Sequence, residues 1–353
     1  MNLKKENISL KYLNSNEKIY LDDERLINLK RNSKKMANFL SEIKGIKKNK
    51  ITRMMNCSNV LIYKNFKEIN YRKLFKAFTC KVLLCPLCMA RKSILLKNNL
   101  YKVLKFGAKE HELEYIHLVL TQKNCKVEEL GKSVNLLLKA FIKLSKRDLF
   151  RRTGKGAKDV FKGWYRNLEI TFNEEEKTFH PHFHCILAVK KDYFKNNPNY
   201  LTQEKAIKIW RECLNVDYDP TVFLNKIYYL DENNEKVIAL QNGQDLKKAV
   251  EEVSKYVTKT FELMTIKDEK LKKKVIKNLF SGLAHRRLIA YGGILKSIKA
   301  ELKLADEEKT DLIKLGEEEI DTSDMEYFIE LFKWCDDNKG QYEKFMEILD
   351  KNS

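Results

Sequence analysis

Three histidines and one glutamate have the spacing in this chain that best suits chemistry. His180, His182 and His184 occupy alternate positions in the segment HPHFHCILAV, and alternation predicts a β-strand that projects three imidazoles from one face. The preceding segment RNLEITF also alternates, and the polar tip NEEEK between the two predicts a β-hairpin. A turn at the centre of that tip places Glu169 directly opposite His182.

One carboxylate and two or three imidazoles within reach of one ion indicate a divalent metal site. Mixed imidazole and carboxylate ligands with open positions suit Mn²⁺ or Mg²⁺ acting on a phosphate, whereas imidazole alone would also suit Zn²⁺. The alternative is that these histidines pack or lie exposed on a strand that binds no metal. Three of the six histidines of the chain fall within five positions, opposite an acid, and this concentration favours a metal site.

Four cysteines form a second candidate metal site. Cys85 and Cys88 make a CxxC motif, Cys80 lies five positions before it, and Cys57 lies further upstream beyond a strand-like segment. Four thiolates from a short motif and a distant loop match a structural Zn²⁺ site that closes tetrahedrally. A redox motif is the rival, but it usually opens a helix in a thioredoxin-type βαβ unit, which is not predicted here. Buried thiols without metal are the third alternative.

A glutamate and a tyrosine one helical turn apart are the next candidates. Apolar residues in DLKKAVEEVSKYVTKTFELM recur at helical spacing, which predicts a helix over 245–264. Glu252 and Tyr256 are i,i+4 neighbours on this helix, and Lys255 and Lys259 adjoin them. Spacing alone does not single out Tyr256 among 16 tyrosines.

The elements that must position these residues indicate an α+β fold. The segment IHLVLTQKN reads as a buried strand beside the histidine hairpin, and His117 within it is interpreted as structural more readily than as a ligand. Gly154 and its neighbours lie in no GxxxxGK(S/T) string, so we reject a nucleotide-hydrolysing phosphate loop. Further predicted elements are helices over 21–46, 132–149 and 201–214, two strands and a polar turn over 222–240, and a helix in MEYFIELFKWC.

Composition and charge indicate a polyanionic partner. The net charge is +20, yet from Glu301 onward 17 acidic residues outnumber 7 basic ones, which leaves 62 basic and 32 acidic residues before it. A basic body favours nucleic acid, although an AT-biased genome also produces lysine-rich surfaces. No segment approaches the roughly 20 apolar residues of a membrane span, and the first residues lack the apolar core of a signal peptide. We therefore expect a cytoplasmic location and reduced thiols.

Two strings in the sequence resemble a known family. HPHFHCILAV, with His182 and His184 around a phenylalanine, is similar to the paired-histidine motif of HUH endonucleases, and in particular of rolling-circle plasmid replication initiators (Rep proteins). EEVSKYVTK is similar to their nucleophile motif, in which a lysine precedes the tyrosine and a glutamate lies four residues before it. The strings CKVLLCPLCMARKS, IHLVLTQKN and GWYRNLEITFN resemble other segments of the family, so the resemblance spans roughly Cys57 to Lys303.

The resemblance implies an origin-specific DNA nickase. Tyr256 would attack a phosphodiester to leave a 5′-phosphotyrosine and a free 3′-OH, and Glu252 would activate the water that ends the cycle. The implied partners are single- and double-stranded DNA at a replication origin, with host helicase and polymerase. The remaining expected roles are catalytic Mn²⁺ or Mg²⁺ on His182, His184 and Glu169, structural Zn²⁺ on Cys57, Cys80, Cys85 and Cys88, and phosphate contacts from Lys255 and Lys259.

The fold implied by the resemblance is a central antiparallel sheet with RRM-like, HUH-nuclease topology and helices packed on it. A Cys-rich zinc knuckle would precede this domain and a helical tail would follow it. The expected boundaries are a basic arm over 1–50, the Cys-rich segment with a helix over 51–110, the nicking and joining domain over 111–303, and an acidic helical tail over 304–353.

Three alternative functions remain open. A conjugative relaxase or transposase of the same superfamily is the nearest, but relaxases commonly place their tyrosine before the histidine pair, and here Tyr256 follows it. A DNA-binding regulator with structural zinc and an inactive nuclease is the second. A metal-dependent hydrolase without a covalent step is the third.

Overall fold

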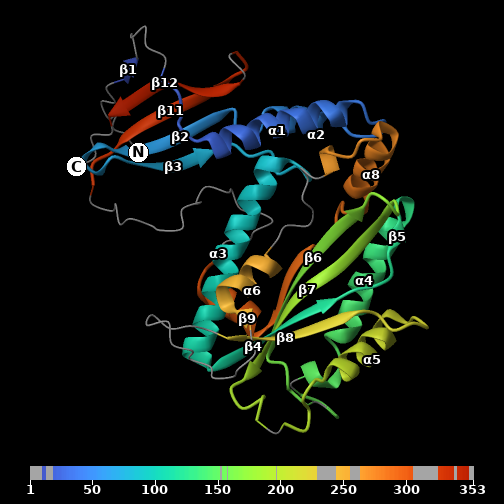
Figure 1. The fold of residues 1–353 in the computed structure, drawn as a ribbon. Coiled ribbons are helices and arrows are strands. Elements are labelled where there is room, and N and C mark those ends of the chain that lie inside the picture. Colours follow the sequence, from blue (N-terminus) through green and yellow to red (C-terminus); the bar gives the residue numbers. More distant parts are fainter. Residues whose placement is uncertain are drawn as a thin grey trace, which may run out of the picture. The chain divides into compact units, whose positions relative to one another are not determined.

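The chain divides into two units, each of which is described by itself. The computed structural model describes residues 10–12, 19–151, 153–156, 158–195, 197–228, 244–254, 263–304, 325–337 and 340–349. One unit, the cysteine unit, comprises Met1–Leu95 and Glu307–Ser353, and the other, the histidine unit, comprises Leu96–Asp306 (Figure 1). Both units combine helices with a mainly antiparallel sheet, which confirms the α+β class.

The histidine unit is built on a sheet whose strands follow the order β10-β6-β7-β4-β8-β9, with β5 paired to β7. All of these pairs are antiparallel except β8 with β9. The histidine strand β7 therefore lies inside the sheet, between β6 and β4. The strands are β4 (Leu113–Leu120), β5 (Cys125–Lys126), β6 (Gly163–Asn173), β7 (Thr178–Lys190), β8 (Val222–Tyr228), β9 (Gln244–Asp245) and β10 (Ile289–Gly293).

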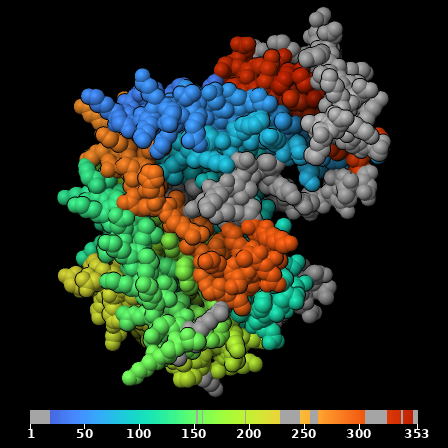
Figure 2. Space-filling view, turned by 180° about the vertical axis from the view of Figure 1, so that it is seen from behind, coloured from blue at the N-terminus to red at the C-terminus, as the bar shows by residue number. Residues whose placement is uncertain are grey.

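Helices cover both faces of this sheet. The α-helices are α3 (Pro86–His111, in this unit from Leu96), α4 (Leu130–Leu144), α5 (Gln203–Leu214), α6 (Leu246–Val253), α8 (Glu269–Gly282) and α9 (Ile294–Glu301), and short 3₁₀ turns are η2 (Val127–Glu129) and η3 (Asp148–Phe150). On one face, Phe141 of α4 packs edge-on against Phe183 of β7, with ring centroids 5.5 Å apart. Helix α8 lies beside α4 on the outside, where Figure 2 shows them side by side.

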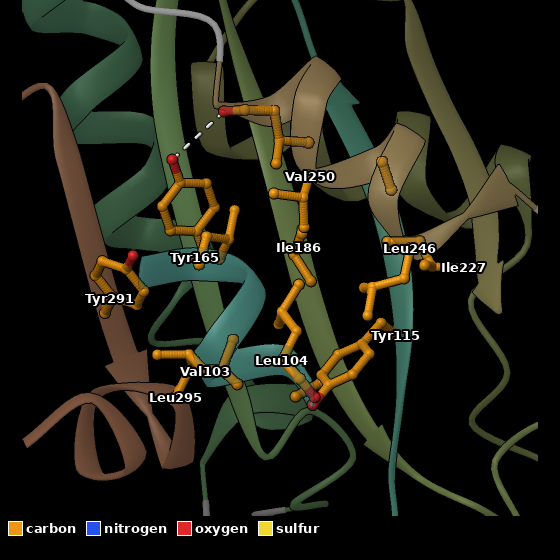
Figure 3. Packing of buried hydrophobic residues seen from close by; sticks show 14 of the residues in the cluster. Val103, Leu104, Tyr115, Tyr165, Ile186, Ile227, Leu246, Val250, Tyr291 and Leu295 are labelled. Carbon is orange, nitrogen blue, oxygen red and sulfur yellow. Dashed lines mark hydrogen bonds between the residues drawn. The ribbon is translucent and has the colours of Figure 1, made fainter. Parts of the chain in front are cut away.

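The opposite face carries the main apolar core. Ile186 and Ala188 of β7 pack there with residues of α3, α6 and α9 (Figure 3). Because side chains two apart share a face of a strand, His182 and His184 lie on this same face, beyond the apolar end of β7. The sheet face thus changes from apolar to polar toward the start of β7.

Caps explain where the helices of this unit begin and end. The Thr202 hydroxyl accepts a hydrogen bond from the Lys205 amide at the start of α5, and Asn215 ends the helix in the left-handed conformation. The Asp268 carboxylate accepts from the amides of Lys270 and Leu271 at the start of α8. The helix predicted over 201–214 is confirmed.

The cysteine unit has a second sheet, of order β1-β12-β11-β2-β3. Its strands are β1 (Leu10–Tyr12), β2 (Val60–Phe66), β3 (Tyr71–Ala77), β11 (Phe328–Cys335) and β12 (Gln341–Leu349), and its helices are α1 (Glu24–Ser41), α2 (Lys48–Met55), the 3₁₀ turn η1 (Lys67–Ile69) and the start of α3. Two segments far apart in the sequence thus share one sheet, since β11 pairs with β2.

The prediction of a helix in the acidic C-terminal segment, and hence of a helical tail, is wrong. Residues of MEYFIELFKWC form β11 instead, in a hairpin with β12. A short apolar run fits either period, and here pairing with β2 decides the outcome. Glu330, which lies within this run, is 1% exposed and pairs with Arg72 at 2.6 Å and Lys344 at 3.1 Å.

The N-terminal helix packs into the core of the cysteine unit. The Asp23 carboxylate caps α1 by accepting from the Leu26 amide at 2.8 Å. Its buried side includes Met36 and Leu40 together with the polar Lys30 and Ser33. The helix predicted over 21–46 is therefore confirmed, and its buried face belongs to the core of the cysteine unit. Among the described helices, none combines the length and the apolar character that crossing a membrane requires.

Candidate metal and nucleophile site

The hairpin of β6 and β7 brings the predicted ligands together. Glu169 lies directly opposite His182 in the antiparallel register, as the alternation predicted. The turn is closed by the Asn173 side chain, which accepts a hydrogen bond from the Glu176 amide at 3.0 Å, and Lys177 adopts a positive φ of 54°. The local turn therefore fixes which residues meet across the two strands.

The geometry of Glu169, His182 and His184 suits one cation. Glu169 Oε2 lies 2.9 Å from His184 Nε2 and 3.6 Å from His182 Nε2. One ligand atom of each residue lies within 4.8 Å of the other two. The two histidines and the glutamate are each 7–8% exposed. These three side chains would therefore separate a bound ion from most of the surrounding water.

The outer nitrogen of each ring has a partner. His182 Nδ1 lies 3.1 Å from the His180 carbonyl oxygen, and His184 Nδ1 lies 3.3 Å from His117 Nε2. Contacts of this kind orient an imidazole and leave its other nitrogen to face a metal. Both Nε2 atoms accordingly point to the Glu169 carboxylate.

The electrostatics of the cluster favour a charged carboxylate. Burial by itself would raise the pKa of Glu169, but hydrogen bonds with His182 and His184 outweigh burial and lower this pKa to about 2. His180 shares the strand face, but its Nδ1 lies 2.7 Å from the Asn124 side-chain oxygen. The cluster of possible ligands in the described residues contains His182 and His184, the two histidines expected as ligands, and omits His180.

His117 is the residue that sequence reasoning undervalued. It is 2% exposed on β4, and its ligand atom lies within 4.8 Å of those of His184 and Glu252. The pattern of β4 predicted a buried position, but only the register of β4 against β7 brings His117 to His184. The sequence signal was a buried histidine on a strand expected beside the hairpin.

The end of α6 is fixed next to this cluster. Asn167 Nδ2 donates to the Val253 carbonyl at 3.0 Å, and the Tyr165 hydroxyl donates to the same oxygen at 3.4 Å (dashed line in Figure 3). Asn167 and Tyr165 precede Glu169 on the same face of β6. The last residue of α6, Val253, is therefore held by Asn167, which lies two residues before Glu169 on β6.

The predicted nucleophile lies outside the described residues. Residues 255–262 include Tyr256, Lys255 and Lys259, so their roles stay predictions. Glu252 is described, on the last turn of α6, and joins His117 and His184.

The four predicted cysteine ligands also come together. The sulfur atoms of Cys57, Cys80, Cys85 and Cys88 all lie within 4.8 Å of one another. Cys57 and Cys80 each lie 3.5 Å from Cys88, sulfur to sulfur. All four side chains are buried. A hydrogen bond from Cys80 lowers the pKa of Cys57, and the same contact raises the pKa of Cys80.

The fold and these clusters define the class: a strongly basic α+β protein with three groups of side chains suited to metal ions, two of which share His184. The sequence profile of the replication protein family matches residues 71–343. The chain belongs to this family, the Rep proteins that initiate plasmid replication.

Similar proteins cover most of the chain. A "Protein rep" of Lactiplantibacillus plantarum is 37% identical over 288 residues, which are 81% of this chain and 85% of the relative. A "Protein rep" of Bacillus amyloliquefaciens is 33% identical over 329 residues, 87% of this chain and 93% of the relative. A "Protein rep" of Streptococcus pneumoniae is 31% identical over 283 residues, 80% of each chain. No solved structure matches significantly.

Proposed function

We propose that this Rep protein starts replication by nicking one DNA strand at the plasmid origin through a covalent tyrosine intermediate. The observation that carries the proposal is the buried cluster of Glu169, His182 and His184, whose ligand atoms lie within 4.8 Å of one another. Such a cluster in a strongly basic chain suits an ion that acts on a DNA phosphate. The sheet that holds it would be an HUH-type, RRM-like platform.

The three ligands fit Mn²⁺ or Mg²⁺. Two imidazole nitrogens and one carboxylate leave coordination positions open for phosphate oxygens and water. When bound, the ion would supply Lewis-acid stabilisation of the charge that develops on the phosphate oxygens. His117 and the His180 carbonyl hold the two rings in the required orientation.

Tyr256 would be the nucleophile. Its phenolic oxygen attacks phosphorus, and the bond from phosphorus to the 3′ oxygen breaks. The phenol gives up its proton, and the released 3′ oxygen takes up a proton to become a 3′-OH. The energy of the broken bond is kept in a 5′-phosphotyrosine, which a 3′-OH can later attack to rejoin the strand. Tyr256 follows the anchored Val253 by three residues, a span of at most about 11 Å. That reach supports a phenol close to the ion.

Glu252 would act as a general base. Its carboxylate lies beside His117 and His184, where it can accept a proton from the water that attacks the phosphotyrosine at termination. Lys255 and Lys259 would pair with phosphate oxygens or stabilise the phenolate. Origin DNA in single- and double-stranded form would bind to the basic part of the chain before Glu301. In the cytoplasm, a host helicase would unwind the duplex and a host polymerase would extend the 3′ end.

The test is a cleavage assay with single-stranded DNA from the plasmid that encodes the chain. Overlapping oligonucleotides that tile the whole plasmid are incubated with the protein and Mn²⁺, and adducts are separated on a denaturing gel. We expect a protein–DNA adduct with one set of overlapping oligonucleotides. Tyr256→Phe should abolish the adduct, and Tyr200→Phe, which removes a hydroxyl from an exposed tyrosine, should leave it unchanged.

Other outcomes contradict parts of the proposal. An adduct that persists in Tyr256→Phe would reject this nucleophile. Cleavage without an adduct would favour a hydrolase, and specific binding without cleavage would favour a DNA-binding regulator. His182→Ala should abolish cleavage at every Mn²⁺ concentration. Full activity in that variant would reject the metal site.

A further inference from the structure

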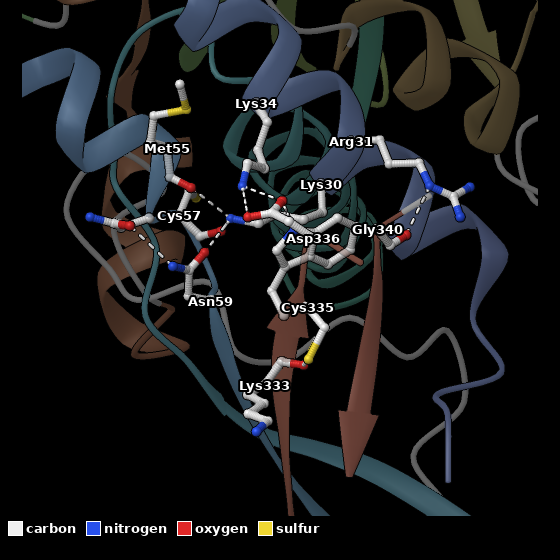
Figure 4. Close-up of polar contacts among 12 residues, drawn as sticks. Lys30, Arg31, Lys34, Met55, Cys57, Asn59, Lys333, Cys335, Asp336 and Gly340 are labelled. Carbon is white, nitrogen blue, oxygen red and sulfur yellow. Dashed lines mark hydrogen bonds and ion pairs between the residues drawn. The ribbon is translucent and has the colours of Figure 1, made fainter. Parts of the chain in front are cut away.

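Two buried cations lie beside the four cysteines of the cysteine unit. Lys30, on α1, is 0% exposed. Its Nζ donates to the carbonyl oxygens of Met55 at 2.9 Å and Cys57 at 2.7 Å, and to the Asn59 side-chain oxygen at 2.6 Å (Figure 4). All three acceptors are neutral, so they satisfy the donors of the ammonium group without balancing its charge.

Arg91 is the second cation. It lies one helical turn after Cys88 on α3 and is 1% exposed. None of its three guanidinium nitrogens has a hydrogen-bond partner among the described residues. Burial lowers the pKa of the Arg91 guanidinium, and the nearby Tyr63 hydroxyl and Cys88 and Cys57 thiols act in the opposite direction. A buried guanidinium without a counter-charge is costly, so its position needs an explanation.

We propose that Cys57, Cys80, Cys85 and Cys88 bind one Zn²⁺ as four thiolates, and that Lys30 and Arg91 are the counter-charges of this complex. A zinc ion with four thiolates carries two negative charges, and the two buried cations carry two positive ones. The assembly is then neutral within a region that water does not reach. Four protonated thiols would leave Arg91 without a counter-charge, and would leave Lys30 only the influence of the exposed Asp336 carboxylate, which already pairs with Lys34. This inference is independent of the proposed nicking reaction.

The sulfur positions fit the ion. Zinc bonds to sulfur of about 2.3 Å place tetrahedral sulfurs about 3.8 Å apart. The observed separations of 3.5 Å from Cys88 to Cys57 and Cys80 need only a small expansion. The Ser33 hydroxyl lies 3.4 Å from the Cys85 sulfur and accepts a hydrogen bond from the Leu87 amide. Helix α1 therefore contacts the cysteine loops through Ser33 as well as through Lys30.

The C-terminal hairpin holds the loop that carries Cys57. The Tyr342 hydroxyl donates to the Ser58 carbonyl at 2.7 Å, and the Trp334 amide donates to the Asn59 carbonyl at 2.7 Å. The Lys30 ammonium lies 5.8 Å from the Trp334 ring centroid. Zinc would therefore connect the N-terminal helix, the cysteine loops and the C-terminal hairpin, and its removal should loosen all three.

The experiment measures zinc affinity in the full-length chain with the His184→Ala substitution, which removes the ligand shared by both histidine groups, so that the histidine unit contributes no zinc. Metal content is determined by mass spectrometry, and affinity by competition with a chelator of known strength. We expect one zinc per chain. Lys30→Met and Arg91→Met should each weaken zinc binding at least about tenfold, because each leaves a charge uncompensated in the interior.

Two controls separate charge from general damage. Lys34→Met removes a cation one turn further along α1, where Lys34 pairs with the exposed Asp336, and it should change the affinity less than about twofold. Arg91→Lys keeps the charge and should restore most of the affinity lost in Arg91→Met. Circular dichroism at saturating zinc identifies any variant that fails to fold.

A hydrogen-exchange measurement on the parent chain, in which Lys30 and Arg91 are unchanged, tests the proposal even if the substituted chains fail to fold. Chelation of the zinc should increase amide hydrogen exchange in β11 and β12, and added zinc should reverse the increase. Absence of bound zinc, disulfides among the four cysteines, or zinc affinities in Lys30→Met and Arg91→Met equal to the parent's would each overturn the proposal.

Discussion

His117 Nε2 lies 3.3 Å from His184 Nδ1, and the two rings stack with centroids 5.5 Å apart. The other nitrogen of His184 faces Glu169 at 2.9 Å. His117 therefore fixes the orientation of the His184 ring, a proposed metal ligand, from the side opposite the metal. It also lies beside Glu252 at the end of α6. This contact joins three elements that are distant in sequence: β4, the β6–β7 hairpin and α6.

Substitution of His117 should weaken the binding of the catalytic ion. We expect His117→Ala to lower Mn²⁺ affinity about 10- to 100-fold, as loss of a contact to a ligand's outer nitrogen commonly does. His117→Gln keeps a polar group near His184 and should lose less. Isothermal titration with Mn²⁺ measures both effects.

The control for this prediction is His111→Ala, which removes an exposed imidazole near the end of α3. It should leave Mn²⁺ affinity unchanged. If His117→Ala bound Mn²⁺ as tightly as the parent, His117 would be a packing residue and not a support for the ligand.

Gly293 occupies a conformation that other residues avoid. Its φ of 57° and ψ of −144° lie near a region open almost only to glycine. A Cβ atom there would lie 2.7 Å from the Gly163 Cα atom. Gly293→Ala should therefore lower the free energy of unfolding by about 2–4 kcal/mol, measured by urea denaturation followed through tryptophan fluorescence.

Gly131→Ala is the matched control, since a Cβ atom at this position in α4 meets its nearest neighbour at an ordinary 3.6 Å. It should be neutral or stabilise by up to about 1 kcal/mol, because alanine favours helices. Equal effects of the two substitutions would show that the backbone conformation of Gly293 costs little.

The histidine site could be predicted in outline because its register is local. The alternation of β6 and β7 and a five-residue polar tip suffice to pair Glu169 with His182. The position of His117 could not be predicted, because it depends on how β4, some sixty residues earlier, aligns with β7. The same limit applies to Arg91, because its role as a counter-charge depends on four cysteines from separate segments coming together one helical turn before it.

The prediction for the C-terminal segment failed for a different physical reason. Phe328 to Cys335 is short and apolar enough to suit a helix or a strand, and the energy that decides comes from pairing with β2, more than 260 residues away. Glu330 looks like a surface acid in the sequence but is buried between Arg72 and Lys344. Partners this distant leave no trace in the local pattern.

Acid should weaken the cysteine unit through Glu347. Burial by itself would raise the pKa of this carboxyl, but hydrogen bonds with Lys344 and Lys67 outweigh burial and lower it. A carboxyl whose pKa is lower in the folded state stabilises the fold above its unfolded pKa, and this contribution is lost as pH falls through the folded pKa. We expect Glu347→Gln to flatten the acid side of the stability profile.

The loss of stability at neutral pH should stay below about 1 kcal/mol, because Lys67 is half exposed and the buried Lys344 keeps its ion pair with Glu330. Thermal melting from pH 7 down to pH 3 measures the profile. Glu326→Gln, at an exposed position before β11, should keep the parent's acid response. A Glu347→Gln variant with the parent's profile would assign the acid sensitivity to other carboxyls.

The Tyr342 hydroxyl should stabilise the C-terminal hairpin. This side chain is 0% exposed, and its hydroxyl donates to the Ser58 carbonyl at 2.7 Å. Tyr342→Phe leaves that buried carbonyl without this donor, which should cost about 1–2 kcal/mol. Amide hydrogen exchange in β12 should speed up by about five- to thirtyfold, as expected for that free energy. Tyr327→Phe, whose ring packs against Phe66 in the same unit, should change exchange little, and equal rates in both variants would mean that the hairpin is held by its apolar contacts alone.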